Sequence, residues 1–179
     1  EKRKWLSGRG VNIPSFEIFT SPDWRGVDGW IRFSEPLYRY GNIIKGIELW
    51  FEKGRVVKFK ATKNEKILKA MIETKNADKV GEFSLTDRRF SKIDKFMAET
   101  LYDENIGGKY GNTHLALGLA FKDCSTLDQK TTKKKEWEEY GYNDSVVHTD
   151  MMSTTNRTVI AMLNNGKEQV IYKDGEVVS

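Results

Sequence analysis

The run HLALGLAF, residues 114–121, alternates between two kinds of side chain along its whole length. The small or polar positions are His114, Ala116, Gly118 and Ala120, and the large apolar positions are Leu115, Leu117, Leu119 and Phe121. Because successive side chains of a strand point to opposite faces, the pattern predicts a strand with one face on a core. The other face holds a histidine among small residues, which leave room for something other than protein. His114 is therefore a candidate ligand in a pocket.

Similar periodicities predict the rest of the fold. Two apolar runs flank Glu52-Lys53-Gly54-Arg55 and indicate a hairpin. Apolar residues at helical spacing predict a helix in EKILKAMIETKNA, residues 65–77, with Asn64 as its N-cap. Further strands are expected at VGEFSL, at SVVHTDMM and in the last segments of the chain. We expect an α+β fold with a curved, mostly antiparallel or mixed β-sheet and two or three helices.

Composition excludes several classes of function. Hydrophobic residues make up 38% of the 179 residues, enough for a core, and the net charge of +4 is too small to indicate nucleic-acid or membrane binding. No apolar run is long enough to cross a bilayer. The basic run KKK at 133–135 fits a solvated loop or short helix, or a contact patch for a partner. The single cysteine, Cys124, excludes an internal disulfide and permits a cytoplasmic location.

Carboxylates in apolar surroundings accompany both histidines. His148 and Asp150 stand two residues apart in VVHTD, so they share a strand face roughly 7 Å apart at the backbone. Such a pair alone is also typical of a hydrogen-bonded surface pair. Glu17 and Glu82 interrupt apolar strand segments, and Glu104 precedes the glycine-rich turn that leads to His114. Since buried carboxylates are costly unless paired or metal-bound, this set suits a dinuclear metal site, although the spacings match no zinc-finger or HExxH motif.

Several blocks of the sequence resemble one enzyme family. In chain order they are SGRGVNIPSFEIFTSP, GEFSL, LYDENIGG, THLALGLAF and GYNDSVVHTDMM. They resemble the thermophilic-type metallo-aminopeptidases, the aminopeptidase T and aminopeptidase S group of leucyl aminopeptidases. The resemblance covers nearly the whole chain but only the C-terminal part of the family. We therefore expect residues 1–179 to form a single catalytic domain without the family's N-terminal domain.

The resemblance implies a two-metal exopeptidase that releases N-terminal amino acids from peptides. Such enzymes use two divalent ions, either zinc, cobalt or magnesium, and are typically cytoplasmic homodimers that bind neither nucleic acid nor membrane. The implied metal ligands fall on Glu17, Glu82, Glu104, His114, His148 and Asp150. The resemblance also implies a general base, for which the candidates are Glu82 and Glu17.

Two departures from the family pattern bear on activity. The family's active-site tyrosine is replaced by Phe121, which cannot donate a hydrogen bond, and the turn between Glu104 and His114 is longer than usual, so it could displace Glu104. A regular strand would also place Phe121 opposite His114, so the family geometry requires a bend, for which Gly118 is the candidate. The alternative function is a catalytically impaired family member that acts as a metal-binding or assembly module.

Overall fold

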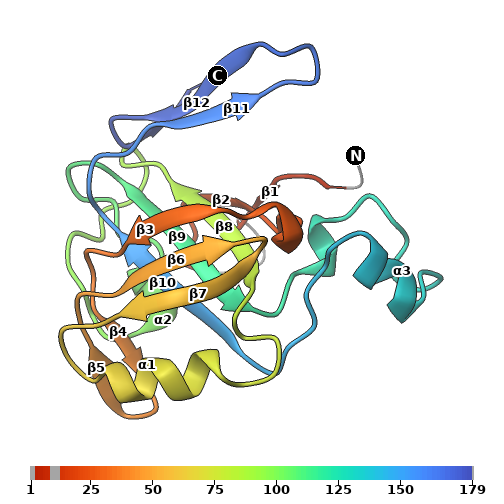
Figure 1. Ribbon diagram of the computed structural model, residues 1–179. Helices are drawn as coiled ribbons and strands as arrows, with labels where there is room; N and C mark the ends of the chain where they lie inside the picture. Colours follow the sequence, from red (N-terminus) through yellow and green to blue (C-terminus); the bar gives the residue numbers. More distant parts are fainter. Residues whose placement is uncertain (1–2, 9–12, 179) are drawn as a thin grey trace.

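An antiparallel sheet of five strands forms the centre of the computed structural model, which describes residues 3–8 and 13–178. The strand order is β1-β2-β8-β9-β10. These strands are β1 (Leu6–Ser7), β2 (Glu17–Thr20), β8 (Val80–Thr86), β9 (Asn112–Gly118) and β10 (His148–Ser153). Neighbours in this sheet are far apart in sequence, so residues from both halves of the chain meet on its faces (Figure 1).

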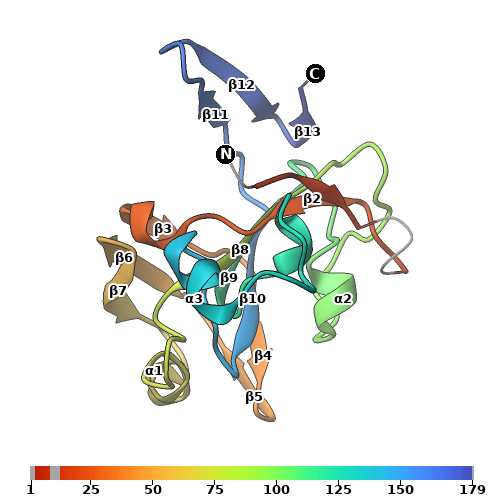
Figure 2. The same cartoon turned by 90° about the vertical axis from the view of Figure 1, so that its right-hand side faces the viewer.

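A second layer covers one face of the central sheet. It consists of β3 (Gly29–Arg32), β6 (Glu48–Glu52), β7 (Arg55–Lys60) and helix α1 (Glu65–Ile72) (Figure 2). Leu115 and Leu117 of β9 pack in one cluster with Leu49 of β6 and Leu68 of α1. The predicted core face of residues 114–117 is therefore confirmed.

The predicted hairpin is formed by β6 and β7. Its turn residues Lys53 and Gly54 have φ of 49° and 78°, the left-handed values that a two-residue hairpin turn requires. The predicted helix is also present as α1, which is shorter than predicted and ends at Ile72. Asn64 is its N-cap residue, as predicted, but it has φ 58° and its side chain does not cap the helix; Nδ2 donates to the Ile43 carbonyl at 2.8 Å.

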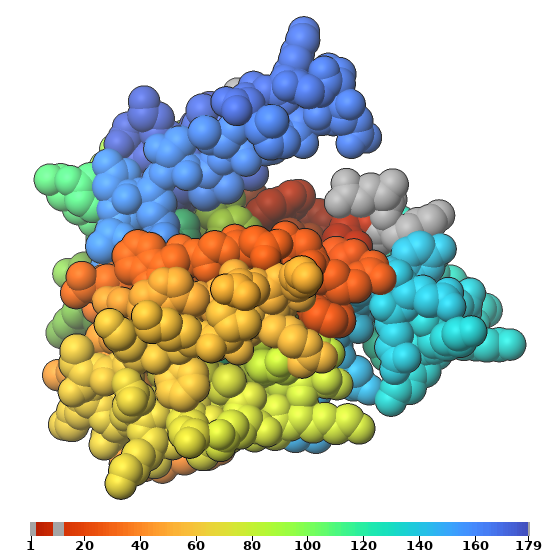
Figure 3. Space-filling view, viewed as in Figure 1, coloured from red at the N-terminus to blue at the C-terminus, as the bar shows by residue number. Residues whose placement is uncertain are grey.

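The remaining elements lie around these two layers. They are β4 (Leu37–Arg39), β5 (Asn42–Ile44), α2 (Thr100–Asp103), α3 (Lys134–Glu139), β11 (Val159–Met162), β12 (Glu168–Lys173), β13 (Glu176–Val177) and the 3-10 helices η1 (Trp24–Gly26) and η2 (Lys122–Cys124). The β11–β12 hairpin stands away from the body of the molecule (Figure 3), anchored by the Tyr172 hydroxyl, which donates to the Thr86 carbonyl at 2.9 Å. The α+β class is confirmed, and none of the described helices is long and apolar enough to span a membrane.

The chain bends sharply where β9 ends. Gly118 has φ +103°, and a Cβ there would lie 1.9 Å from the Val147 carbonyl oxygen. Asn143 Nδ2 donates to the Gly118 carbonyl at 2.6 Å and holds the bend. Phe121 consequently lies on the side of the sheet that carries His148, with the two ring centroids 4.6 Å apart. Strict alternation, which placed Phe121 with Leu115 on the core face, is wrong beyond Gly118.

Gly118→Ala should be markedly more destabilising than Gly29→Ala, by about 1 to 3 kcal/mol in urea unfolding. Both glycines have a similar φ, +103° and +114°, so both variants carry backbone strain of roughly 1 to 3 kcal/mol. Only at Gly118 would the new methyl group collide with backbone, since nothing lies within 4 Å of a Cβ at Gly29. Equal losses in the two variants would show that the close approach to Val147 is unimportant.

Candidate metal centre

The face of the central sheet opposite the core carries the candidate ligands. Ala116 of β9 pairs with Glu82 of β8 on one side and with Asp150 of β10 on the other. Because cross-strand partners share a face, the two carboxylates flank a methyl group, which leaves open space above it. His114, two residues before Ala116 in β9, lies on the same face, and its cross-strand partner is Ser84 of β8. The predicted face of small residues is confirmed for His114 and Ala116, whereas Ala120, beyond the bend at Gly118, packs with Trp137 and Tyr142 instead.

A bulge in β8 turns Glu82 onto this face. Val80 and Glu82 are two residues apart, yet Val80 lies in the core and Glu82 on the opposite face. The register shift between them, at Gly81, accounts for this, because one extra residue reverses the alternation. A Cβ at residue 81 would lie 2.1 Å from the Leu119 carbonyl oxygen, so the bulge requires glycine.

The two imidazoles point at shared carboxylates. The Nε2 atom of His114 lies 3.7 Å from Glu17 Oε2, 3.5 Å from Glu82 Oε1 and 3.8 Å from Asp150 Oδ1. The Nε2 atom of His148 lies 3.2 Å from Glu82 Oε2 and 3.3 Å from Asp150 Oδ1. Glu82 and Asp150 thus contact both histidines, whereas Glu17 contacts His114 alone among them.

Backbone and hydroxyl groups fix the orientation of these side chains. His148 Nδ1 lies 2.8 Å from the Leu119 carbonyl, which makes Nδ1 the protonated donor and directs Nε2 toward the carboxylates. Ser84 Oγ donates to Glu17 Oε2 at 2.5 Å. Metal-binding histidines commonly have such a partner on the other ring nitrogen.

Glu104 joins the same cluster from the C-terminal end of α2. One of its carboxylate oxygens lies within 4.8 Å of ligand atoms of His114 and Asp150. Its backbone carbonyl accepts hydrogen bonds from Thr86 Oγ1 and Asn112 Nδ2, both at 2.9 Å, which tie the loop to the sheet. The long turn before His114 therefore does not displace Glu104.

Crowding of charged groups shifts their pKa values strongly. Burial raises the pKa of Glu17, and it raises the pKa of Glu104 to about 9. Burial opposes protonation of His148, but the carboxylates of Asp150 and Glu82 beside its ring outweigh burial and raise the pKa to about 10. Burial also opposes protonation of His114, but the neighbouring carboxylates, Glu82 foremost, raise its pKa. The cluster thus retains protons that a bound cation would replace.

The residues fit a divalent metal. His114 Nε2 and Asp150 Oδ1 are buried and have no hydrogen-bond partner among the described residues, which is costly unless a cation engages them. Imidazole nitrogens combined with carboxylate oxygens are ligands that zinc, cobalt and manganese accept. The residues implied as ligands by the resemblance all lie in this one cluster.

The cluster forms the floor of a cavity of about 280 Å³. The cavity is lined by Leu6, Glu17, Phe19, Glu82, Glu104, Phe121, Asp123, His148 and Asp150. Phe121 contacts His148 and lies edge-on to Phe19, with ring centroids 6.0 Å apart. Phe121 therefore lines the cavity with an aromatic ring that offers no hydroxyl.

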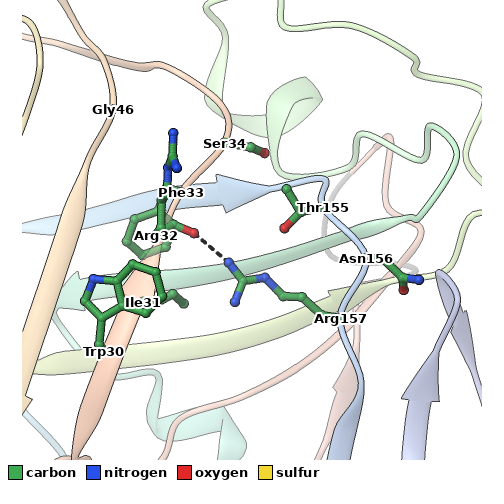
Figure 4. Close-up of a pocket in the computed structure, with 9 residues that line it drawn as sticks. All are labelled: Trp30, Ile31, Arg32, Phe33, Ser34, Gly46, Thr155, Asn156 and Arg157. Atoms are coloured by element: carbon green, nitrogen blue, oxygen red, sulfur yellow. Dashed lines mark hydrogen bonds between the residues drawn. The ribbon is translucent and has the colours of Figure 1, made fainter.

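A larger cavity of about 690 Å³ lies elsewhere, between β3 and the segment after β10 (Figure 4). Arg157 Nη2 donates to the Arg32 carbonyl across it, at 2.6 Å. Its described lining includes Trp30, Ser34 and Thr155 but no histidine, cysteine or carboxylate. The groups that can bind a metal belong to the smaller cavity.

Sequence reasoning missed three contributors to the metal cavity. Ser84 follows Glu82 at the same-face interval and could have been found from that spacing. The Leu119 carbonyl is a backbone group placed by the bend at Gly118, and Asp123 lies outside every predicted motif. The residue type of Leu119 or of Asp123 does not indicate that either belongs to the cavity.

Comparisons with known proteins agree with this geometry. The family described as thermophilic metalloprotease (M29) matches residues 1–177. Aminopeptidase AmpS of Bacillus subtilis is 34% identical over 169 residues, 92% of this chain and 40% of that protein. Aminopeptidase T of Thermus thermophilus is 30% identical over 171 residues, 93% of this chain and 40% of that protein.

A solved structure shows the same fold. Wild-type AmpT from Thermus thermophilus superposes with a TM-score of 0.85 at 27% identity, over 100% of this chain and 46% of that one. The chain spans less than half the length of these relatives. With the family match along nearly its whole length, this chain belongs to the thermophilic metalloprotease (M29) family.

Proposed function

We propose that residues 1–179 form a single catalytic domain of a two-metal aminopeptidase, which hydrolyses the first peptide bond of its substrate. The observation that carries this proposal is the convergence of Glu17, Glu82, Glu104, His114, His148 and Asp150 in one cluster, all of which except His114 line one cavity. The proposal is also supported by the names of the relatives, which are aminopeptidase AmpS and aminopeptidase T.

Charge balance supports two ions rather than one. The carboxylates of Glu17, Glu82, Glu104 and Asp150 carry a formal charge of −4 when ionised, equal in magnitude to two divalent cations. The two imidazoles favour zinc or cobalt over magnesium, which prefers oxygen ligands. When bound, the ions supply Lewis acidity that activates a water and polarises the scissile carbonyl.

The chain's own residues have separable roles in this reaction. Glu82 contacts both imidazoles, so its carboxylate would help to hold a divalent ion at either histidine. Glu17 contacts only His114, and burial raises its pKa, so it is placed to accept a proton from water and pass it to the leaving amine. Ser84 holds Glu17 through Oε2 and leaves its other oxygen for that transfer.

The family resemblance also suggests the substrate, the cellular location and the oligomeric state. The substrate is a peptide with a free N-terminus, and the cavity's Leu6, Phe19 and Phe121 suit an apolar first side chain. We extend the proposal to a cytoplasmic homodimer that binds neither nucleic acid nor membrane, as the single cysteine and the small net charge permit.

A second candidate function is a metal-binding or assembly module with impaired catalysis. It would follow from Phe121, which lines the cavity at the position where the resemblance implies a tyrosine. Removal of one donor to a developing oxyanion lowers kcat by about 10²- to 10³-fold in other enzymes. The two candidates share metal binding and differ in turnover.

Protein purified without chelators should contain close to two zinc or cobalt ions per chain by elemental analysis. Glu82→Gln should lower the metal content and reduce hydrolysis of leucyl-p-nitroanilide by about 10³-fold or more. The reason is that it removes the negative charge of the carboxylate that lies beside both histidines. Glu52→Gln, an exposed change at the β6 turn, is the matched control and should alter neither. A wild-type chain that takes up no zinc or cobalt would refute the metal site.

Phe121→Tyr should raise kcat on leucyl-p-nitroanilide, by up to about 10²-fold, because it restores a hydroxyl donor beside His148. The change should appear in kcat more than in KM, since the donor acts in the transition state. Phe90→Tyr, at an exposed position, controls for the added hydroxyl. Unchanged turnover in Phe121→Tyr would show that the missing hydroxyl does not limit the enzyme.

A further inference from the structure

Asp123 is the one carboxylate in the described lining of the metal cavity that belongs to no metal-ligand group. It lies in the 3-10 helix Lys122–Cys124, two residues after Phe121, and its side chain is exposed. The carboxylates of the floor are buried and engaged with histidines or hydroxyls. Asp123 is therefore a charged group in the cavity wall that metal binding does not use.

The carboxylate of Asp123 is oriented by its own loop. Gln129 Nε2 donates to Oδ1 at 2.6 Å, and within the described part of the chain Oδ2 accepts no hydrogen bond. No lysine, arginine or histidine of the described residues forms an ion pair with it. One oxygen is thus held in place, and the other has no partner among the described residues, in a side chain whose residue lines the cavity.

The cavity then presents three kinds of surface. Its floor carries the metal ligands, one wall is apolar through Leu6, Phe19 and Phe121, and Asp123 supplies a negative charge. The first residue of a peptide has three matching groups: a scissile carbonyl, a side chain and an ammonium group. With the floor charges balanced by two cations, Asp123 is the remaining anion, and the apolar wall strengthens its attraction for a cation.

We propose that Asp123 binds an ammonium group of the substrate's N-terminal residue, with Gln129 as the positioning residue for the carboxylate. This inference rests on the proposed aminopeptidase function. The ammonium can be the α-amino group, which every free N-terminus has, or the side-chain amine of an N-terminal lysine. The chemistry at Asp123 is the same in both cases, and substrate pairs distinguish them.

Calorimetric titration of the zinc-loaded chain tests the inference without requiring turnover. Leucinol, lysinol and 4-methylpentan-1-ol, which lacks the α-amine, are the probes, because none of them has an amide bond to hydrolyse. Wild type should bind leucinol more tightly than 4-methylpentan-1-ol, and Asp123→Asn should weaken amine binding by about tenfold while leaving 4-methylpentan-1-ol unchanged. Loss for both amines identifies the α-ammonium as the ligand, and loss for lysinol alone identifies the side chain.

The matched control is Asp128→Asn, which removes one charge from the same loop. Asp128 lies outside the cavity lining and accepts a hydrogen bond from Lys130 N at 2.9 Å, a turn that asparagine can also make. Gln129→Leu should shift amine binding in the same direction as Asp123→Asn but less. If Asp123→Asn binds all three probes as Asp128→Asn does, the inference is overturned.

Kinetics separate failure of this inference from failure of the proposed function. An active wild type whose kcat/KM on leucyl- and lysyl-p-nitroanilide is unaffected by Asp123→Asn retains the function and refutes the role of Asp123. A wild type that binds zinc but hydrolyses neither substrate refutes the function, and the titrations still decide whether Asp123 binds an amine.

Discussion

Burial of four carboxylates beside two imidazoles on one face of a sheet is the constraint on which the structure depends. Ionised carboxylates are costly away from water and repel one another, so the surrounding fold must hold them against both effects. The central sheet does this because its opposite face is fixed by the core of Leu115, Leu117 and their partners. Hydrogen bonds from Ser84 and to the Leu119 carbonyl then set the orientations. As a result, His148 Nε2 lies at nearly the same distance from Glu82 Oε2 and from Asp150 Oδ1.

Local periodicity made much of this fold predictable. The two-residue repeat of β9 assigned Leu115 to the core and His114 to the site, because a strand leaves no other choice of faces. The same reasoning located the β6–β7 hairpin, whose turn chemistry is encoded in Lys53-Gly54. The candidate ligands required the family resemblance as well, since no spacing in this chain matches a known metal motif.

What could not be predicted depends on contacts between distant segments. Asn64 stands at the predicted N-cap position, but its side-chain amide bonds to the Ile43 carbonyl, 21 residues away, and does not cap the helix. The reversal of faces at Gly81 exists because the Leu119 backbone approaches from another strand end. Asp123 enters the cavity only because the bend at Gly118 redirects the chain after β9. Glycine at positions 81 and 118 permits the bulge and the bend, but residue type does not indicate which strand becomes a neighbour.

The order of strands in the central sheet has a consequence for folding. Glu17 and Asp150 lie at opposite ends of the sequence, on β2 and β10, and the ligands between them come from three further segments. The denatured chain cannot hold this set together, so ions that bind it favour the native state by mass action. Each bound ion acts as a removable cross-link that closes long loops, much as a disulfide does, in a chain with a single cysteine. Thermal stability of this domain is thereby coupled to the free concentration of its metal, and protons compete for the same side chains.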